Sequence, residues 1–330
     1  MLSSISDSDK RTATRAMVVL LALVLAYMSV LEVAARIEFP RINHVWRDIG
    51  ADYRRATSLR PAAADRSATI LVVGNSYLDV GVDRERLQQE ISPAYSAAYL
   101  PIQGTAYLDW YFGLRRLFAE GSRPAIVGVC LSTRQLVSDA TFGEPFAHTL
   151  MLESDVLRVK EESHLDNTMM SDYFFANFSS WLGHRGEIRN WILRKSVPAI
   201  ADLVSYFRDR TPPGPLSDAA VAQALQRLRL LKELSSENGA RFFFLIPPTL
   251  DVQDASNELQ TAAAKEGMVV VLPFQHAELP PTGFREDHEH LNSTGAALFT
   301  VRLGPALLQS LSVFAPQLQA QEAASSSAAK

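Results

Sequence analysis

The feature that most constrains the fold is a series of five short, continuous apolar runs separated by amphipathic stretches. The runs are TILVV, YSAAYL, PAIVGVCL, ARFFFLIP and GMVVVLP, which begin at residues 69, 95, 124, 240 and 267. Continuous apolar runs are typical of parallel strands that are buried on both faces, and the helices between them provide the crossovers. The pattern therefore predicts an α/β fold, a three-layer αβα sandwich around a parallel sheet.

A longer apolar segment near the start of the chain predicts a membrane anchor. Residues 16–35 carry one charge, at Glu32, and a run of about 20 apolar residues crosses a bilayer as a helix. The basic residues before the segment are Lys10, Arg11 and Arg15. By the positive-inside rule, residues 1–15 are cytoplasmic and the rest of the chain lies outside. We therefore expect a single-pass protein of the inner membrane with a periplasmic domain.

Two other interpretations of this segment stay open. Val33-Ala34-Ala35 is an acceptable cleavage site for a signal peptide, and a buried core helix is also compatible with an apolar run. After the segment we expect a linker over 36–67 and one domain over 68–316, with a helical insertion at 138–215 above the sheet edge. The insertion is expected either to pack there or to act as a lid or acceptor groove. Residues 317–330 are expected to be a disordered tail.

The composition excludes several classes of protein. A net charge of −4 and a pI near 6.0 give no basic surface, so nucleic acid is not an expected partner. The single cysteine, Cys130, excludes an intrachain disulfide and a cysteine-rich zinc site. Its apolar neighbours predict a small core residue.

The first candidate for chemistry is Ser76, in the stretch ILVVGNSYLDV. Because ligands bind at the carboxyl ends of parallel strands, Asn75-Ser76, the Gly104 region and Ser132-Thr133 are expected along one edge of the sheet. A serine at this place can present its hydroxyl beside backbone N–H groups. Taken alone, however, Gly-Asn-Ser is also a common turn sequence.

The stretch FREDHEHLNSTG, residues 284–295, changes that interpretation. Asp287 and His290 lie three residues apart, and in a turn before a helix this spacing brings a carboxylate to the imidazole Nδ1. The carboxylate then orients the ring and stabilises its protonated form, which leaves Nε2 to face Ser76. Asn292-Ser293 is expected to cap the last helix.

Two other interpretations of DHEH also stay open. His288 and His290, with Asp287 and Glu289, have the chemistry of a metal site, although no second cluster supports one. A solvated polar loop is the other. We expect neither a metal nor a cofactor. The remaining histidines have the pattern of ordinary surface or structural residues; they are His148, His164, His184 and His276.

The two stretches together resemble the SGNH (GDSL-like) hydrolase superfamily. There a Gly-Asp/Asn-Ser block follows the first core strand and an Asp-x-x-His block precedes the last helix, as GNS at 74–76 and DHEH at 287–290 do here. DHEHLNSTG is similar to the form found in membrane-anchored relatives, which include exopolysaccharide acetyltransferases and proteins that assist cell-wall acylation. The resemblance covers roughly residues 68–132 and 238–311.

The resemblance implies a nucleophile at Ser76, a general base at His290 and an orienting acid at Asp287. It also implies oxyanion donors at the N–H groups of Ser76 and Gly104. The family's Gly-x-Asn-Asp block has no counterpart after AIVGVCL, where Ser132-Thr133-Arg134 stands. Ser132, or Thr133, is therefore the candidate for the third donor.

We accordingly expect serine-dependent acyl transfer or ester hydrolysis, with O-acetyl groups on a cell-envelope or exported glycan as the substrate. The resemblance implies a membrane-bound acyltransferase as a partner that supplies the acyl group. The alternative is a degenerate, non-catalytic SGNH domain that binds glycan or scaffolds an envelope polysaccharide complex. Trp110, Trp181 and Trp191 offer sugar-stacking surfaces in that case and core packing otherwise.

Overall fold

The computed structural model describes residues 7–61, 67–197, 214–251, 253–276 and 278–315. Five parallel strands form one sheet in the order β2-β1-β3-β4-β5. They are β1 Ala68–Gly74, β2 Tyr95–Pro101, β3 Ile126–Cys130, β4 Arg241–Leu245 and β5 Val269–Val271. Each strand falls within or overlaps one predicted apolar run, and helices cover both faces, so the predicted αβα sandwich is confirmed.

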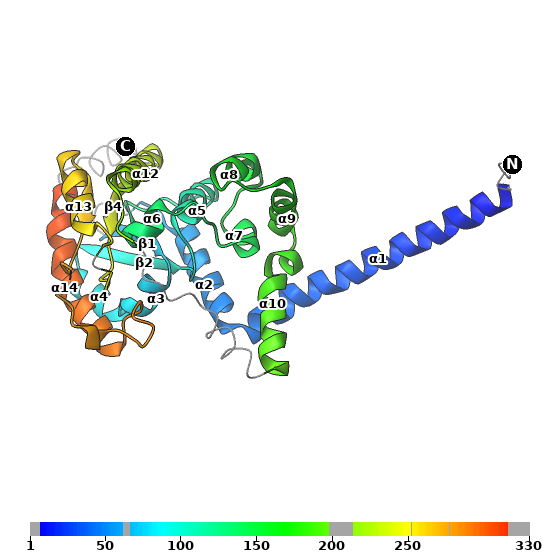
Figure 1. Cartoon of the computed structure of the whole chain (residues 1–330), viewed down its shortest axis with the longest axis horizontal. Helices are drawn as coiled ribbons and strands as arrows, with labels where there is room; N and C mark the ends of the chain where they lie inside the picture. Colours follow the sequence, from blue (N-terminus) through cyan, green and yellow to red (C-terminus); the bar gives the residue numbers. More distant parts are fainter. Residues whose placement is uncertain (1–6, 62–66, 198–213, 252, 277, 316–330) are drawn as a thin grey trace, which may run out of the picture.

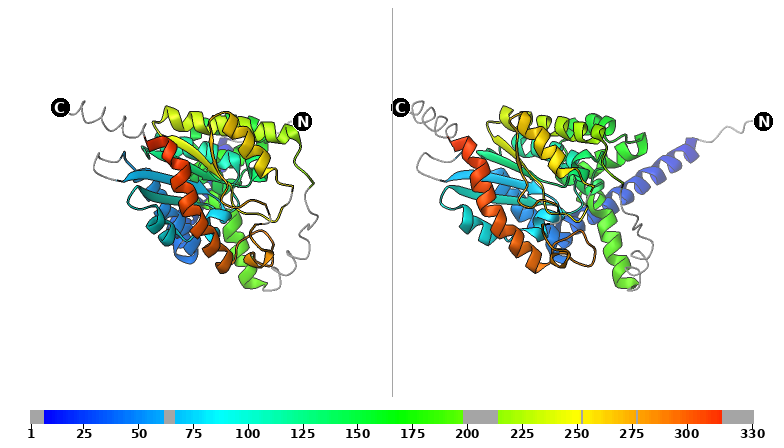
Figure 2. Two further views of the ribbon diagram at one scale, coloured as in Figure 1. Left: turned by 90° about the vertical axis from the view of Figure 1, so that its left-hand side faces the viewer. Right: turned by 60° about the vertical axis from the view of Figure 1, so that its left-hand side comes forward.

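Each face of the sheet has its own hydrophobic core, because successive side chains of a strand point to opposite faces. Leu71 and Val73 of β1 face one core, and Ile70 and Val72 face the other. The first core is covered by α2 (His44–Ser58), α5 (Tyr107–Ala119), α12 (Asp218–Glu237) and α13 (Ser256–Lys265). The second is covered by α3 (Ser76–Gly81), α4 (Arg84–Ile91) and α14 (Ser293–Leu311), which crosses the front of the sheet in Figure 2.

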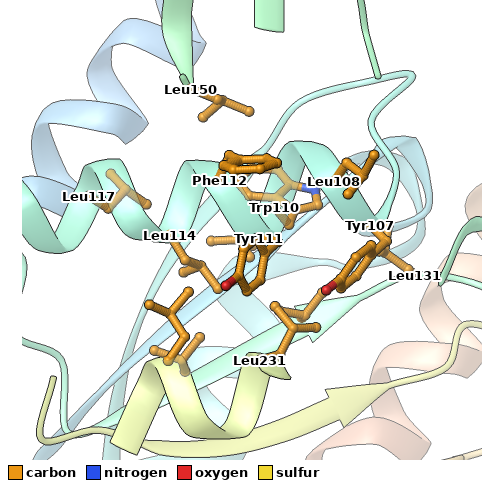
Figure 3. Close-up of a cluster of buried hydrophobic side chains, with 14 of the residues drawn as sticks. Tyr107, Leu108, Trp110, Tyr111, Phe112, Leu114, Leu117, Leu131, Leu150 and Leu231 are labelled. Carbon is orange, nitrogen blue, oxygen red and sulfur yellow. The ribbon is translucent and has the colours of Figure 1, made fainter. Parts of the chain in front are cut away.

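Helix α5 is buried along most of its length and fills the first core (Figure 3). Its Trp110 is fully buried, and the indole Nε1 donates to Thr105 Oγ1 over 2.9 Å. Trp110 is therefore a packing residue and offers no surface for a sugar. Cys130 is a core residue as predicted, and burial raises the pKa of its thiol.

The strand order places a topological switch point between β1 and β3, where connections leave to opposite sides of the sheet. In the register of the sheet, Gly74 at the end of β1 pairs with Pro101 of β2 and with Cys130 of β3. The three strands thus end at one level, and the segments that follow them share one edge.

The predicted apolar segment forms part of α1 (Asp7–Ile42), which leaves the domain as a single long helix (Figure 1). Residues 11–41 have a mean hydropathy of 2.4 within their most apolar window, and none of that window is buried by the rest of the chain. This makes α1 a candidate membrane span. Helix α14 is also long and apolar enough, but it packs on the sheet through Phe299, Leu303 and Leu307.

The stretch expected as a linker carries more structure than that. Residues 36–42 continue α1, and α2 packs Ile49 and Ala56 into the first core. The Ser122 hydroxyl fixes α2 by donating to Ala56 O over 2.7 Å. Six arginines in 36–60 concealed this amphipathic helix, whose buried apolar positions Ile49 and Ala56 are seven residues apart.

The insertion is helical across its described part. Its helices pack on one another, on α5 and on α1. They are α7 (Glu144–Thr149), η1 (Glu153–Asp155), α8 (Val156–Glu162), α9 (Asn167–Phe178) and α10 (Ser180–Ser196), preceded by α6 (Thr133–Val137). Two short 3₁₀ helices, η2 (Pro281–Gly283) and η3 (Ser312–Phe314), flank α14. The predicted tail 317–330 lies outside the described residues.

Candidate active site

Ser76 is the first residue of α3, directly after the end of β1. The strand ends at Gly74, where a Cβ atom would lie 2.6 Å from Cys130 O, so only glycine fits. Asn75 is buried and caps α3, since its Oδ1 accepts from Tyr77 N over 3.0 Å. Its Nδ2 donates to Thr105 O over 3.1 Å. Asn75 thus ties the end of β1 to the loop after β2 and fixes the position of Ser76.

His290 and Asp287 lie on a short closed loop before α14. An antiparallel bridge pairs Phe284 with Leu291 at the base of this loop. Asn292 holds the loop, because its Nδ2 donates to Phe284 O over 3.0 Å while its Oδ1 accepts from Gly295 N and caps α14. The loop therefore presents Asp287 and His290 directly before the start of a helix that packs on the sheet.

The loop brings its imidazole onto the Ser76 hydroxyl. His290 Nε2 lies 2.8 Å from Ser76 Oγ, and His290 Nδ1 lies 2.8 Å from Asp287 Oδ2. An ionised carboxylate only accepts hydrogen bonds, so Nδ1 carries a proton. In the neutral ring Nε2 is then the acceptor of the serine proton. The remaining oxygen, Asp287 Oδ1, accepts from the backbone N–H groups of Glu289 and His290 over 3.0 and 2.9 Å.

These hydrogen bonds keep Asp287 ionised. Burial by itself raises the pKa of this carboxyl, but the backbone N–H groups and the His290 ring outweigh it and lower the pKa to about 2. The ring of Tyr77 packs beside the imidazole, with 5.6 Å between ring centroids. Burial raises the pKa of Tyr77, so its phenol stays neutral beside the pair.

Two of the three expected oxyanion donors have an N–H group that makes no hydrogen bond to any described residue: Ser76 and Gly104. Gly104 adopts φ +79°, and a Cβ atom there would lie 2.8 Å from the Phe142 ring. The Phe142 backbone is held by Asp109, whose Oδ1 accepts its N–H over 2.8 Å. Only glycine therefore fits this turn, and the insertion reaches the edge of the sheet through Phe142.

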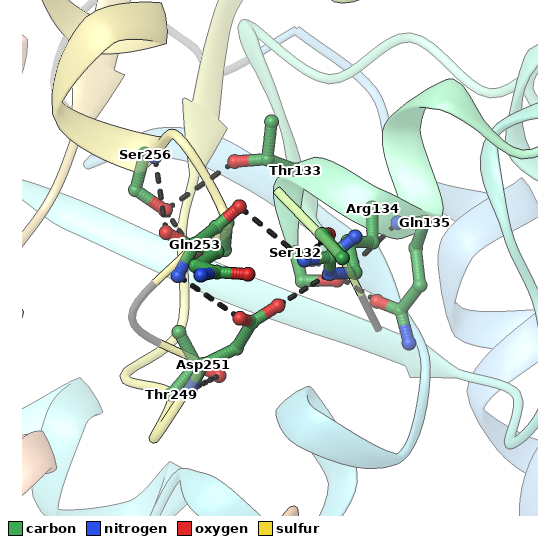
Figure 4. Close-up of polar contacts among 10 residues, drawn as sticks. Ser132, Thr133, Arg134, Gln135, Thr249, Asp251, Gln253 and Ser256 are labelled. Atoms are coloured by element: carbon green, nitrogen blue, oxygen red, sulfur yellow. Dashed lines mark hydrogen bonds and ion pairs between the residues drawn. The ribbon is translucent and has the colours of Figure 1, made fainter. Parts of the chain in front are cut away.

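The third expected donor is placed differently. Ser132 caps α6, and its N–H donates to Gln135 Oε1 over 3.0 Å while its Oγ accepts from Gln135 N. The Thr133 hydroxyl is fully buried and pairs with Ser256 Oγ over 3.3 Å (Figure 4). The Ser132 N–H is thus engaged, and Thr133 points into the polar contacts below α13. The Ser132 hydroxyl keeps its own hydrogen to donate.

Within the described ranges, no group of three or more His, Cys, Asp or Glu side chains is arranged to hold a metal ion. In the DHEH stretch, Asp287 and His290 are turned toward each other, and His290 is also turned toward Ser76.

A cavity of about 530 Å³ lies beside this edge. Its wall includes Asp79 of α3, Gln103, Arg84 and two acids of α2, Asp48 and Asp52. Gln103 is the residue directly before Gly104, and its side-chain amide donates to Asp79 over 2.9 Å. The wall of the cavity is therefore largely polar, and it includes Gln103 but neither Ser76 nor Gly104 itself.

Two buried side chains shape the site in ways that the sequence did not predict: Asn75, expected only to lie beside Ser76 at the sheet edge, and Asp109. The signal for Asn75 was present, because an asparagine before a helix start is a capping residue. Asp109 is the one acid of the mostly apolar helix YLDWYFGLRRLFA, and an acid in the first turn marks a cap. Its contact with Phe142 depends on a loop 33 residues away and leaves no local signal.

Comparison with protein-family models gave no match, and comparison with curated proteins gave none either. Among solved structures, the chain is similar to the crystal structure of TesA at 15% sequence identity, over 72% of this chain and 97% of that one, with a TM-score of 0.37. The likeness is too distant to carry an argument about activity.

Proposed function

We propose that this chain catalyses acyl transfer or ester hydrolysis through a covalent ester on Ser76. The observation that carries the proposal is the continuous series of contacts from Ser76 Oγ to His290 Nε2 and from His290 Nδ1 to Asp287, each 2.8 Å long. Serine is a weak nucleophile at neutral pH, and an adjacent base with an oriented imidazole is the usual way of activating it.

In the first half of the reaction, Ser76 Oγ attacks the ester carbonyl while its proton passes to His290 Nε2. The ionised Asp287 stabilises the imidazolium, and the N–H groups of Ser76 and Gly104 are placed to donate to the oxyanion. His290 then gives the proton to the leaving alcohol. In the second half, an acceptor hydroxyl loses its proton to His290 and attacks the acyl group, and the proton returns to Ser76.

The proposed substrate is an O-acetyl ester, and the acceptor is water or a hydroxyl of a cell-envelope or exported glycan. The polar cavity beside the edge supports a hydroxyl-rich acceptor, because carboxylate and amide groups such as Asp48, Asp79 and Gln103 are hydrogen-bonding partners for hydroxyls. We also propose that α1 anchors the domain at the outer side of the inner membrane, as the basic residues before the apolar run favour. The acyl group would then come from a membrane-bound acyltransferase.

The test is to incubate the full chain with an aryl acetate and a short oligosaccharide, and to measure free acetate and acetylated sugar. We expect the wild-type chain to release the aryl alcohol and the Ser76→Ala chain to release none above background. The ratio of acetylated sugar to acetate distinguishes a transferase from a hydrolase. Equal turnover by the wild-type and Ser76→Ala chains contradicts the proposal.

The engaged N–H of Ser132 favours a second candidate, a domain that binds glycan without catalysis. An oxyanion hole that lacks one donor loses about 10²–10³ in rate. If this candidate holds, glycan binding persists in the Ser76→Ala chain, and the wild-type chain turns over no ester.

A further inference from the structure

Helix α9 carries a cluster of exposed aromatic side chains that the site does not use. Phe174, Phe175 and Phe178 are 42, 57 and 50% exposed, and Met169 on the same helix is 46% exposed. The rings touch one another, with centroids 5.6 Å apart for Phe174 and Phe175 and 5.2 Å apart for Phe174 and Phe178. Three contiguous phenylalanines open to water mark an interaction surface rather than scattered exposure.

This helix is fixed to the end of the apolar segment of α1. Glu32, the one charge of that segment, accepts hydrogen bonds from Ser179 Oγ over 2.7 Å and from the N–H groups of Ser180 and Trp181 over 3.0 and 3.1 Å. These are the first residues after α9, so Phe178 is one residue from a group that binds Glu32 directly. The charge that interrupts the apolar run thus caps α10.

A second set of contacts holds the same junction. Phe39 of α1 stacks on His184 of α10 with 4.4 Å between ring centroids, and Trp46 of α2 packs on the edge of His184. Both Trp46 Nε1 and His184 Nδ1 bond Glu187, over 2.6 and 2.8 Å. The direction of α1 relative to α9 is therefore set by packing on both sides of α10.

Glu32 lies three residues before Ala35, where the apolar run of α1 ends, so it marks the boundary of the bilayer if α1 spans it. The Phe178 end of α9 lies at that level, and Figure 1 shows α9 on the side of the domain toward which α1 extends. Aromatic side chains favour the boundary between headgroups and acyl chains.

We propose that Phe174, Phe175 and Phe178 insert into the outer boundary of the same bilayer that α1 spans, and so fix the orientation of the domain on the membrane. The occupant of this surface is lipid. The inference does not depend on catalysis by Ser76, and it does depend on α1 lying in the membrane.

The test uses nitroxide labels on the full chain in phosphatidylcholine vesicles. Labels are attached at Phe175→Cys, at Leu25→Cys in α1 and at Leu298→Cys in α14, with Cys130 left in place because it is buried. Leu298 is a matched control, since it is 46% exposed and its helix, α14, lies on the opposite side of the domain from α1. Collisions with oxygen, which concentrates in lipid, are compared with collisions with a water-soluble nickel chelate.

We expect the label at 175 to collide more with oxygen than with nickel, as the label at 25 does, and the label at 298 to do the reverse. A label at 175 that behaves like 298 overturns the proposal while α1 remains a span. A label at 175 that is shielded from both reagents also overturns it and shows that a protein covers α9. A label at 25 that is exposed to nickel overturns it together with the anchor.

Discussion

Two serine–histidine pairs occur among the described residues, and only one of them has the surroundings of a reactive group. Ser76 lies 2.8 Å from His290 Nε2 at the sheet edge, and Ser180 lies 3.3 Å from His148 Nε2 at the start of α10. Both imidazoles carry their proton on Nδ1, because in each case the Nδ1 partner only accepts. That partner is the Asp287 carboxylate in the first pair and a main-chain carbonyl in the second.

The neighbours of each pair decide whether the serine can be activated. Burial and the adjacent His184 ring lower the pKa of His148, so this imidazole resists taking a proton. The Ser180 N–H already donates to the Glu32 carboxylate, which would also repel a developing oxyanion. The N–H of Ser76, by contrast, donates to no carboxylate among the described residues. A contact between a serine and a histidine is therefore not enough to activate the serine. The group on Nδ1 and the N–H donors beside the serine decide whether the pair can react.

The largest expected difference between the two pairs comes from removing each serine in turn. Ser76→Ala is expected to lower kcat for ester hydrolysis by about 10⁶, because the nucleophile of a serine–histidine–acid unit is lost. Ser180→Ala is the matched control and is expected to leave kcat unchanged. Steady-state hydrolysis of an aryl acetate measures both. A larger loss in the Ser180→Ala chain than in Ser76→Ala contradicts the assignment.

The next largest effect on kcat is expected from Asp287, the carboxylate that has no counterpart in the Ser180–His148 pair. Asp287→Asn is expected to lower kcat by about 10⁴, because an amide no longer fixes the productive tautomer or stabilises the imidazolium. Glu286→Gln, one residue earlier in the same loop, serves as the control for loop charge. Equal kcat in the Asp287→Asn and wild-type chains would show that His290 needs no acid.

The comparison also depends on backbone donors, which Gly104→Ala tests. The added Cβ meets the Phe142 ring at 2.8 Å on a left-handed backbone, so the turn and its N–H must move. We expect kcat/KM to fall by about 10²–10³, as for loss of one oxyanion donor. Gly267→Ala has a similar φ of +63° with no atom within 4 Å, and it should cost stability alone. An unchanged kcat/KM removes Gly104 from the site.

The smallest effect is on stability and comes from Asp109, which supports that turn. Burial raises the pKa of Asp109 to about 7, although the N–H groups of Phe142 and Ala106 oppose this. In the unfolded chain the pKa of this carboxyl is ~3.9. Between about pH 4 and about pH 7 the native state therefore binds more protons than the unfolded state, and the contribution of Asp109 to stability falls as pH rises.

Asp109→Asn is expected to remove that pH dependence. It also loses about 1–3 kcal/mol, because an amide cannot accept from both N–H groups. Urea denaturation of the full chain at several pH values measures the free energy of unfolding. If the free energy of unfolding of Asp109→Asn depends on pH as steeply as that of the wild type, another group causes the pH dependence.

The sequence predicted the sheet and the Ser76–His290–Asp287 constellation for a physical reason. Continuous apolar runs mark buried parallel strands, and parallel strands bring their carboxyl ends together, so residues 214 positions apart become neighbours. It did not predict α2, whose amphipathic pattern is diluted by arginines. It did not predict that Glu32, an interruption of the apolar run, caps α10, because that contact joins residues about 150 positions apart through tertiary packing.

The most direct test of the central claim is covalent labelling of the folded full chain with a fluorophosphonate, followed by peptide mapping. The account predicts phosphonylation of Ser76, none on Ser180, and loss of the Ser76 label in His290→Ala. Label on Ser180 in place of Ser76, or a folded chain with no labelled serine, would contradict it.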